Sequence, residues 1–307
     1  MKILILGGSG VIGGGICDIL SKIHNIHILN SKIYDRKKNQ YLIDKKLKFD
    51  LFIHAAGVTD EEIYHYGHSS SINRSSVALK KLIKVLAINE CKNFIYISSQ
   101  RVYLNFYRPE KAVFDENRSS IKPTSIYEKC HLLSENVFKK ISQKRCKSLI
   151  IRPGIVFGIP TKNKKISRPK LIQNAFLNSL IKNNKIIINS SGKQFRNFSL
   201  NHDIGKIIVN WMLKKNSKKF TISNAKGKII TILDYAKMCC KEYEKISSKK
   251  TKIIILNKDK SKFIKFKINQ NIKFKSKVSL NLKKFIQTYL KLGLKKKDRN
   301  TLWEISY

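Results

Sequence analysis

Ser99 and Tyr127 are the two side chains best suited to acid–base chemistry in this sequence. Ser99 follows closely on the apolar run Phe94–Ile97, which has the composition of a buried strand. Ser125-Ile-Tyr-Glu128 is a capping-box pattern, so Tyr127 is expected in the first turn of a helix. A tyrosine there, beside a serine at a neighbouring strand end, can exchange a proton with a carbonyl or hydroxyl group.

A tyrosine does this chemistry only if its pKa, about 10 in water, is lowered toward the working pH. A cation one helical turn away would lower it, because residues four apart lie on the same helix face. That position holds His131, which we take as the third catalytic residue, whereas Lys129 points away from this face. The plain alternative for Tyr127 alone is a tyrosine that packs an amphipathic helix.

A glycine-rich turn near the start of the chain predicts a dinucleotide site. It lies between a short apolar run, typical of a buried parallel strand, and a helical pattern. Gly7 permits a tight turn, Gly10 lets a pyrophosphate approach the backbone, and Gly13 lets the helix pack closely. Free N–H groups at the helix start, around Val11 and Ile12, and the helix dipole attract phosphate. The alternative is a glycine-rich turn that binds nothing.

The end of the second predicted strand, Ile26–Leu29, bears on which dinucleotide is bound. An acidic residue at this point would hold the ribose 2′-hydroxyl of NAD. The position is occupied by Asn30, and Lys32 follows, which could pair with the 2′-phosphate of NADP. NAD and NADP therefore both stay open.

The third strong strand pattern, from Asp50 to Ala55, ends in small residues. Ala55, Ala56 and Gly57 leave room for a ligand at the strand end, although a tightly packed strand end explains them equally well. Residues 33–49, before this strand, are polar and short. We expect only a small strand there, near Gln40–Ile43, and a sheet trimmed at this edge.

Together these residues resemble the extended short-chain dehydrogenase/reductase family, in particular its nucleotide-sugar epimerases, dehydratases and reductases. The match runs in order along nearly the whole chain. It comprises the glycine loop, the Ala-Ala strand end, the Ser99 strand with its Val-Tyr pair (96–103), the Pro-x-x-x-Tyr approach to Tyr127 (123–127), the Arg-Pro segment (152–158) and the stretch 194–203.

The resemblance implies an α/β fold: a Rossmann-type doubly wound parallel sheet with a small C-terminal α+β substrate lobe. It implies hydride transfer between NAD or NADP and a sugar carbon, with Tyr127 relaying the proton and Ser99 steadying the oxygen. It places Arg152 near the substrate and Pro153 near the nicotinamide. It also places Arg196 on the phosphates of a nucleotide-sugar substrate.

The sequence departs from the family at one catalytic position. The family's Tyr-x-x-x-Lys, whose lysine lowers the tyrosine pKa and hydrogen-bonds the nicotinamide ribose, here ends in His131. A histidine is shorter and largely neutral above its pKa of about 6.5, so it would stabilise tyrosinate less. The main alternative to an enzyme is therefore a catalytically weak or inactive member that binds RNA or another polyanion.

The remaining sequence predicts two lobes and a tail. We expect a dinucleotide-binding domain over residues 1–157, a mainly substrate-binding lobe over 158–294 with parts returning to the sheet, and a basic tail over 295–307. Further expectations are a polar loop over Asp60–Ser71, helices over Ser75–Asn89 and Arg168–Asn184, and a last helix that Ser279 caps and Gly293 ends.

Composition limits the class of protein. The chain has 307 residues and 42% hydrophobic content, enough for a large core. It begins on a strand and contains no apolar run of about 18 residues, so we expect neither a signal peptide nor a membrane span. Its six cysteines form no Cys-x-x-Cys pair, which predicts reduced thiols in a cytoplasmic protein and no metal site.

The formal net charge of +43 leaves a nucleic-acid partner open. It does not favour one, because lysine far outnumbers arginine, the better bidentate reader of phosphate. The lysines also spread along the whole chain, as in a general compositional bias. We therefore expect a nucleotide-sugar substrate as the main partner. A homodimer, and a reductase that acts on a small non-nucleotide carbonyl compound, stay open.

Overall fold

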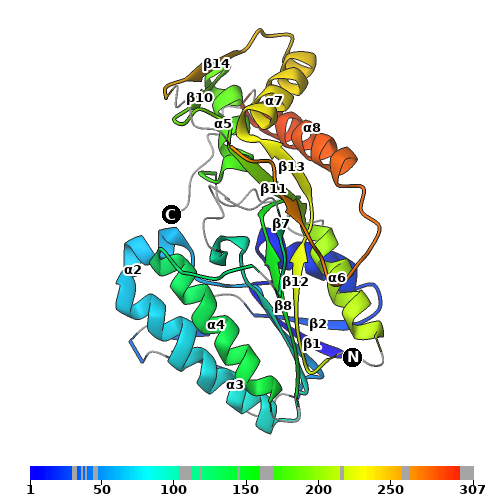
Figure 1. Cartoon of the computed structure of the whole chain (residues 1–307). Coiled ribbons are helices and arrows are strands. Elements are labelled where there is room, and N and C mark those ends of the chain that lie inside the picture. Colours follow the sequence, from blue (N-terminus) through cyan, green and yellow to red (C-terminus); the bar gives the residue numbers. More distant parts are fainter. Residues whose placement is uncertain are drawn as a thin grey trace.

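The computed structural model describes residues 1–29, 33–35, 37–38, 40–43, 48–103, 113–117, 119–143, 146–159, 169–214, 218–257 and 263–297. A six-stranded parallel sheet forms its lower part (Figure 1). The apolar side chains of β1, β5, β6 and β8 are buried on both faces, as a parallel sheet covered by helices requires. In spatial order the strands are β12 (Phe220–Ala225), β8 (Lys147–Pro153), β6 (Asn93–Ile97), β5 (Leu51–His54), β1 (Lys2–Leu6) and β2 (Asn25–Leu29).

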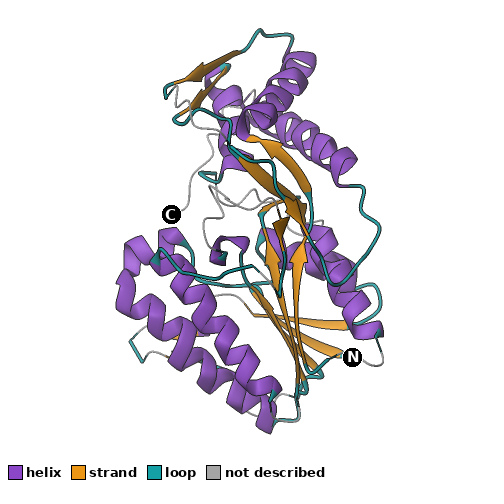
Figure 2. Cartoon of the chain, in the orientation of Figure 1, coloured by secondary structure: helices purple, strands orange, loops and turns teal. Residues whose placement is uncertain are grey.

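Helices cover both faces of this sheet, which confirms the predicted doubly wound α/β architecture (Figures 1 and 2). Successive side chains of a strand point to opposite faces. Ile3 and Ile5 of β1 accordingly pack with α1 (Val11–Leu20) and α6 (Asn201–Leu213). Leu4 and Leu6 pack instead with α3 (Leu79–Ile88) and α4 (Ile126–Ser142).

The segment predicted as a polar loop over Asp60–Ser71 is a helix, α2 (Asp60–Asn73). A capping box begins it: the Thr59 hydroxyl accepts from the N–H of Glu62 at 3.1 Å, and the Glu62 carboxylate accepts from the N–H of Thr59 at 3.2 Å. The prediction was wrong because apolar periodicity is weak along α2, whose one buried residue is Ser71. A π-helical turn, Arg74–Ala78, then leads into α3.

The main sheet is short on one side, as the sequence predicted. β3 (Tyr34–Asp35) and β4 (Gln40–Tyr41) pair with each other, antiparallel, and not with the main sheet. Within the described residues β2 is therefore an edge strand. Asn30 and Lys32, the residues predicted to select between NAD and NADP, lie outside the described residues.

A second lobe lies beyond the carboxyl ends of β8 and β12 (Figure 1). Its core is formed by α5 (Ile172–Asn183), α7 (Ile232–Ser247) and α8 (Val278–Lys297) against a three-stranded sheet of β13 (Lys228–Thr231), β11 (Phe195–Leu200) and β9 (Ile155–Phe157). Two short parallel pairs complete the strands: β10 (Lys185–Ile188) with β14 (Lys252–Ile255), and β7 (Val113–Phe114) with β15 (Lys267–Ile268). The second half of the chain returns to the main sheet through α6 and β12.

The last helix differs from its prediction at both ends. It begins at Val278, so Ser279 lies inside it, and it continues past Gly293 to Lys297. Gly293 does not end α8; it faces Ile181 on α5, and a Cβ there would displace the tip of the Ile181 side chain. Lys295–Lys297 of the predicted tail belong to α8, and residues 298–307 lie outside the described residues.

No helix within the described ranges is long and apolar enough to cross a lipid bilayer. All six cysteines are buried free thiols. Burial raises the pKa of the Cys91 thiol to about 12, so this side chain stays protonated and behaves as a small apolar residue.

Candidate active site

The carboxyl ends of four neighbouring strands bring most of the predicted site residues to one edge of the main sheet. Gly7 follows β1, Ala55 follows β5, and Ser98-Ser99 follow β6, while Pro153 is the last residue of β8. These strands are adjacent and parallel, so their ends share the edge at which open α/β sheets bind ligands. The motifs, far apart in sequence, therefore meet in space.

The glycine loop has the backbone form that a dinucleotide needs. Gly7 has a φ of +87°, in the left-handed region that favours glycine. A Cβ at Gly13 would collide with the carbonyl oxygen of Gly7, whereas a Cβ at Gly10 would meet only that oxygen, at 3.5 Å. Gly10 is thus open on its other sides, and as the N-cap residue of α1 it has no side chain to cap the helix. The glycine loop and the start of α1 therefore fit a pyrophosphate held by first-turn N–H groups such as those of Val11 and Ile12.

The buried side chain of Arg74 contacts the loop Ala55–Gly57. Nη2 of Arg74 donates to the carbonyl oxygen of Ala56 at 3.0 Å, and Nη1 pairs with the Glu62 carboxylate. The N–H of Ala56 donates to Nδ1 of His54 at 3.2 Å. Burial, with a contribution from the Arg74 charge, lowers the pKa of His54 to about 3, so the imidazole is neutral and can accept this bond.

Tyr127 lies in the first turn of α4, as the capping box predicted. The Ser125 hydroxyl accepts from the N–H of Glu128 at 3.3 Å, and the Glu128 carboxylate accepts from the N–H of Ser125 at 3.1 Å. The guanidinium carbon of Arg101 lies 4.0 Å from the centre of the Tyr127 ring. The N–H of Arg101 also donates to the Ser99 hydroxyl at 3.2 Å, so one residue contacts both predicted catalytic side chains.

His131 is buried beside Tyr127, with 4.4 Å between the ring centres. Its Nδ1 shares a hydrogen bond of 2.7 Å with the Tyr96 hydroxyl. Burial, with a contribution from the nearby Arg101 charge, lowers the pKa of His131 to about 3, so the ring is neutral at neutral pH. Nε2 is buried and has no partner at hydrogen-bond geometry in the described chain; a Cβ at Gly57 would lie 2.9 Å from the adjacent Cε1. The ring therefore brings no positive charge to the site.

Arg152, predicted near the substrate, is 1% exposed. Its Nε and Nη2 donate to the Glu135 carboxylate at 2.9 and 2.6 Å, and the same carboxylate accepts from the Ser98 hydroxyl at 2.6 Å. The Arg152 guanidinium also lies over the Tyr103 ring, 4.9 Å from its centre. This side chain therefore joins α4 to β6 and β8. Direct contact with a ligand stays a prediction for Arg152 and for its neighbour Pro153.

Arg196, predicted to contact the substrate's phosphates, lies on β11 in the second lobe and is half-buried. Its Nη1 donates to the carbonyl oxygen of Phe195 at 2.7 Å. β11 pairs with β9, which follows β8 directly, so the strand that carries Arg196 is linked to the site edge by a short connection. Its contact with phosphate stays a prediction.

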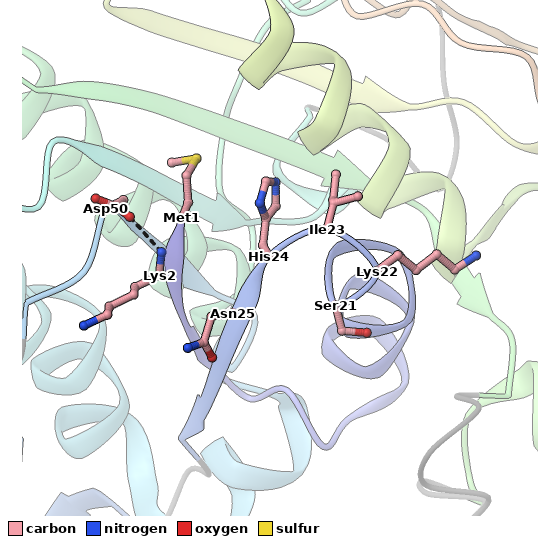
Figure 3. A pocket seen from close by; sticks show the side chains of 8 residues that line it. All are labelled: Met1, Lys2, Ser21, Lys22, Ile23, His24, Asn25 and Asp50. Atoms are coloured by element: carbon pink, nitrogen blue, oxygen red, sulfur yellow. Dashed lines mark hydrogen bonds between the residues drawn. The ribbon is translucent and has the colours of Figure 1, made fainter.

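The depression in Figure 3 lies at the opposite edge of the main sheet. Met1, Asn25 and Asp50 line it from the amino ends of β1, β2 and β5, and the N–H of Lys2 donates to the Asp50 carboxylate at 2.7 Å. Ligands of open α/β sheets bind at the carboxyl ends of the strands. We therefore assign no function to this depression.

The model of the NAD dependent epimerase/dehydratase family matches residues 3–225, a span that contains all three predicted catalytic residues. The chain belongs to this family. A comparison with curated proteins finds no match.

Several solved structures share the fold over nearly their full length. UDP-glucuronic acid 4-epimerase from Bacillus cereus, in complex with UDP-glucuronic acid and NAD, is 19% identical, with a TM-score of 0.72 over 95% of this chain and 99% of that chain. UDP-N-acetylglucosamine 4-epimerase from Methanobrevibacter ruminantium, in complex with UDP-N-acetylmuramic acid, is 17% identical, with a TM-score of 0.76 over 96% and 98%. RMD from Pseudomonas aeruginosa, complexed with NADPH, is 14% identical, with a TM-score of 0.72 over 96% and 99%. At these identities the likeness establishes a shared fold.

In this epimerase/dehydratase family member, three neighbours of the site escaped the sequence analysis: Tyr96, Arg101 and Glu135. Arg101 was visible as a cation two residues after Ser99. Glu135 stands eight residues after Tyr127, about two helical turns along α4, and was visible as a carboxylate close to the same face. Tyr96 gave no signal, because it stands within the apolar run of β6.

Proposed function

We propose that the protein is an NAD(P)-dependent enzyme that oxidises or reduces a carbon of a nucleotide sugar, in an epimerisation, a dehydration or a carbonyl reduction. The observation that carries this proposal is the convergence of the glycine loop, Ser99 and Tyr127 at one edge of the parallel sheet. Family membership supports it. Relatives of the same fold that were solved with UDP-sugars, NAD or NADPH support the substrate class and the cofactor.

Each step of the proposed reaction is assigned to particular residues of the chain. A nicotinamide cofactor, when bound, supplies the hydride acceptor or donor. The glycine loop would hold its pyrophosphate, Ala55–Gly57 would lie beside it, and Nε2 of His131 would make one hydrogen bond to its ribose. Tyr127 would take the proton of the sugar hydroxyl or return it, while Ser99 holds the same oxygen. Arg196 would pair with the diphosphate of the substrate.

Calorimetric titration with NAD and with NADP, at low and at high salt, tests the cofactor step. We expect one of the two to bind with an affinity that salt changes little, because glycine-loop N–H groups and not mobile lysines hold the pyrophosphate. Absent binding, or binding abolished by salt, would contradict the proposal. It would favour a polyanion-binding protein driven by the charge of +43, and RNA would be the next titrant.

Tyr127→Phe separates binding from chemistry in the same preparation. We expect cofactor affinity to stay unchanged and turnover of UDP-sugars to fall by roughly 10²-fold or more, because the proton relay is lost. Equal turnover in the variant would remove Tyr127 from the catalytic role.

A further inference from the structure

His131 cannot supply the positive charge that a proton-relaying tyrosine needs. Its ring is 4% exposed, its Nδ1 is bound to the Tyr96 hydroxyl, and its pKa of about 3 keeps it neutral near pH 7. Tyr96 is protonated as well, because burial raises the pKa of its phenol. The hydrogen-bonded pair of His131 and Tyr96 therefore brings no positive charge to Tyr127.

A cation contacts the Tyr127 ring from the turn after β6. The guanidinium carbon of Arg101 lies 4.0 Å from the ring centre, and its side chain is 21% exposed, so water screens it only in part. The same residue fixes the Ser99 hydroxyl through its backbone N–H, at 3.2 Å. A substitution of the side chain leaves this N–H in place, so the two functions can be separated.

We propose that Arg101 is the positioning residue that supplies, through space, the positive charge at Tyr127 that His131 does not. This inference rests on the proposed proton relay through Tyr127. Tyrosinate carries a full negative charge and an electron-rich ring, so a guanidinium on its face stabilises it more than the neutral phenol. Tyr127 then gives up its proton more readily than an isolated tyrosine would.

Two carboxylates contact the Arg101 guanidinium, and their negative charges oppose its effect on the Tyr127 pKa. Asp60 pairs with Nη1 of Arg101 at 2.6 Å but is 66% exposed, so solvent screens it. Glu128 lies 3.7 Å from Nε and is buried, yet its other oxygen accepts from the Thr124 N–H and hydroxyl at 2.6 and 2.8 Å and from the Ser125 N–H at 3.1 Å. These donors fix the Glu128 carboxylate in the capping box, and the cation in contact with the Tyr127 ring is the Arg101 guanidinium.

The ionisation of Tyr127 itself tests the inference without turnover. The phenol is titrated by NMR in protein with ¹³C-labelled tyrosine, and its signal is assigned by its loss in Tyr127→Phe. We expect Arg101→Met to raise the Tyr127 pKa by about one unit. Arg101→Lys should restore most of the shift. Lys129→Met is the matched control: it removes the same charge two residues from Tyr127 on the same helix, from an exposed side chain, and should change little.

Asp60→Asn distinguishes this electrostatic role from a merely structural one. It breaks the ion pair that ties the turn to α2 but leaves the cation, so the Tyr127 pKa should stay equal or fall. If Arg101 only held the turn in place, Asp60→Asn and Arg101→Met would move the pKa in the same direction. Either that result or an unchanged pKa in Arg101→Met would overturn the proposal.

Turnover provides a second readout. With a UDP-sugar substrate, Arg101→Met should lower kcat at neutral pH by about tenfold, the equivalent of one pKa unit, with recovery at higher pH and little change in KM. If the wild type turns over no nucleotide sugar, the proposed function fails, while the NMR titration still decides whether Arg101 tunes Tyr127.

Discussion

Two buried histidines flank Tyr96 and make the stability of the fold sensitive to acid. The His54 ring centre lies 5.4 Å from that of Tyr96, and His131 is hydrogen-bonded to its hydroxyl. Burial, with smaller contributions from the charges of Arg74 at His54 and Arg101 at His131, lowers the pKa of each imidazole from 6.5 to about 3. In the unfolded chain the same two rings bind protons near pH 6.5.

Between about pH 6.5 and pH 3 the unfolded chain therefore binds more protons than the folded one, so the free energy of unfolding falls as the solution is acidified. We expect a loss of a few kcal/mol between about pH 7 and pH 4.5, measured by urea unfolding. His131→Gln should flatten this dependence, since one of the two rings is removed. His65→Gln, at an exposed position, should leave it unchanged. An equally steep pH dependence in His131→Gln would contradict the assignment.

Single residues were predictable from the sequence where a local pattern fixes them. Ser99 follows an apolar run, and Tyr127 stands inside a capping box, so both could be placed before the fold was known. The surroundings of Arg152 could not be predicted in this way. Its partner Glu135 lies on α4, and only the packing of the folded chain brings the two side chains together. The sequence did not reveal that this side chain is almost fully buried, and its place near a substrate stays a prediction.

Helices and strands were likewise predictable from the sequence where a local pattern defines them. β1, β5 and β6 each contain a short apolar run, small residues follow each strand, and composition alone located them. α2 was missed because its capping box and acidic first turn define it more than any apolar stripe does. Gly293 was misread because a glycine after an apolar helix is typical of a helix end, whereas here it lies inside α8 and faces Ile181 on α5. Whether a glycine ends a helix or lies inside one that packs against a neighbour depends on that neighbouring helix.

Two glycines of the loop between β1 and α1 should respond differently to the same methyl group. A Cβ at Gly10 makes only an ordinary 3.5 Å contact, so Gly10→Ala should fold normally but bind NAD or NADP at least about tenfold more weakly, because the methyl group blocks the pyrophosphate. A Cβ at Gly13 collides with the Gly7 carbonyl, so Gly13→Ala should destabilise the fold by about 1–3 kcal/mol. Calorimetry and urea unfolding measure the two effects. Wild-type affinity in a folded Gly10→Ala would show that this loop does not hold the pyrophosphate.

Over the whole molecule, 63 lysines and arginines face only 20 acidic residues. The imbalance is visible on single helices: on α7 the exposed Lys241 has Lys237 one turn before it and Lys245 one turn after it. Like charges four residues apart destabilise a helix, and a large net charge destabilises the compact state as a whole. Screening by salt should relieve both effects, since the Debye length falls from about 30 Å at 0.01 M to about 3 Å at 1 M.

Lys241→Glu turns two repulsive pairs on α7 into attractive ones, turns its single attractive pair with Glu244, three residues on, into a repulsive one, and lowers the net charge of the molecule. We expect it to raise the free energy of unfolding by about 0.5–1 kcal/mol at low ionic strength, and by much less near 1 M salt. Lys241→Gln is the matched control, because it removes one charge without adding its opposite and should give about half the gain. Urea unfolding at both salt concentrations measures all three proteins. If the wild type were equally stable at low and at high salt, and neither variant gained, the excess positive charge would not measurably destabilise the fold. An excess of lysine that costs no folding free energy would then carry no argument for a polyanion partner.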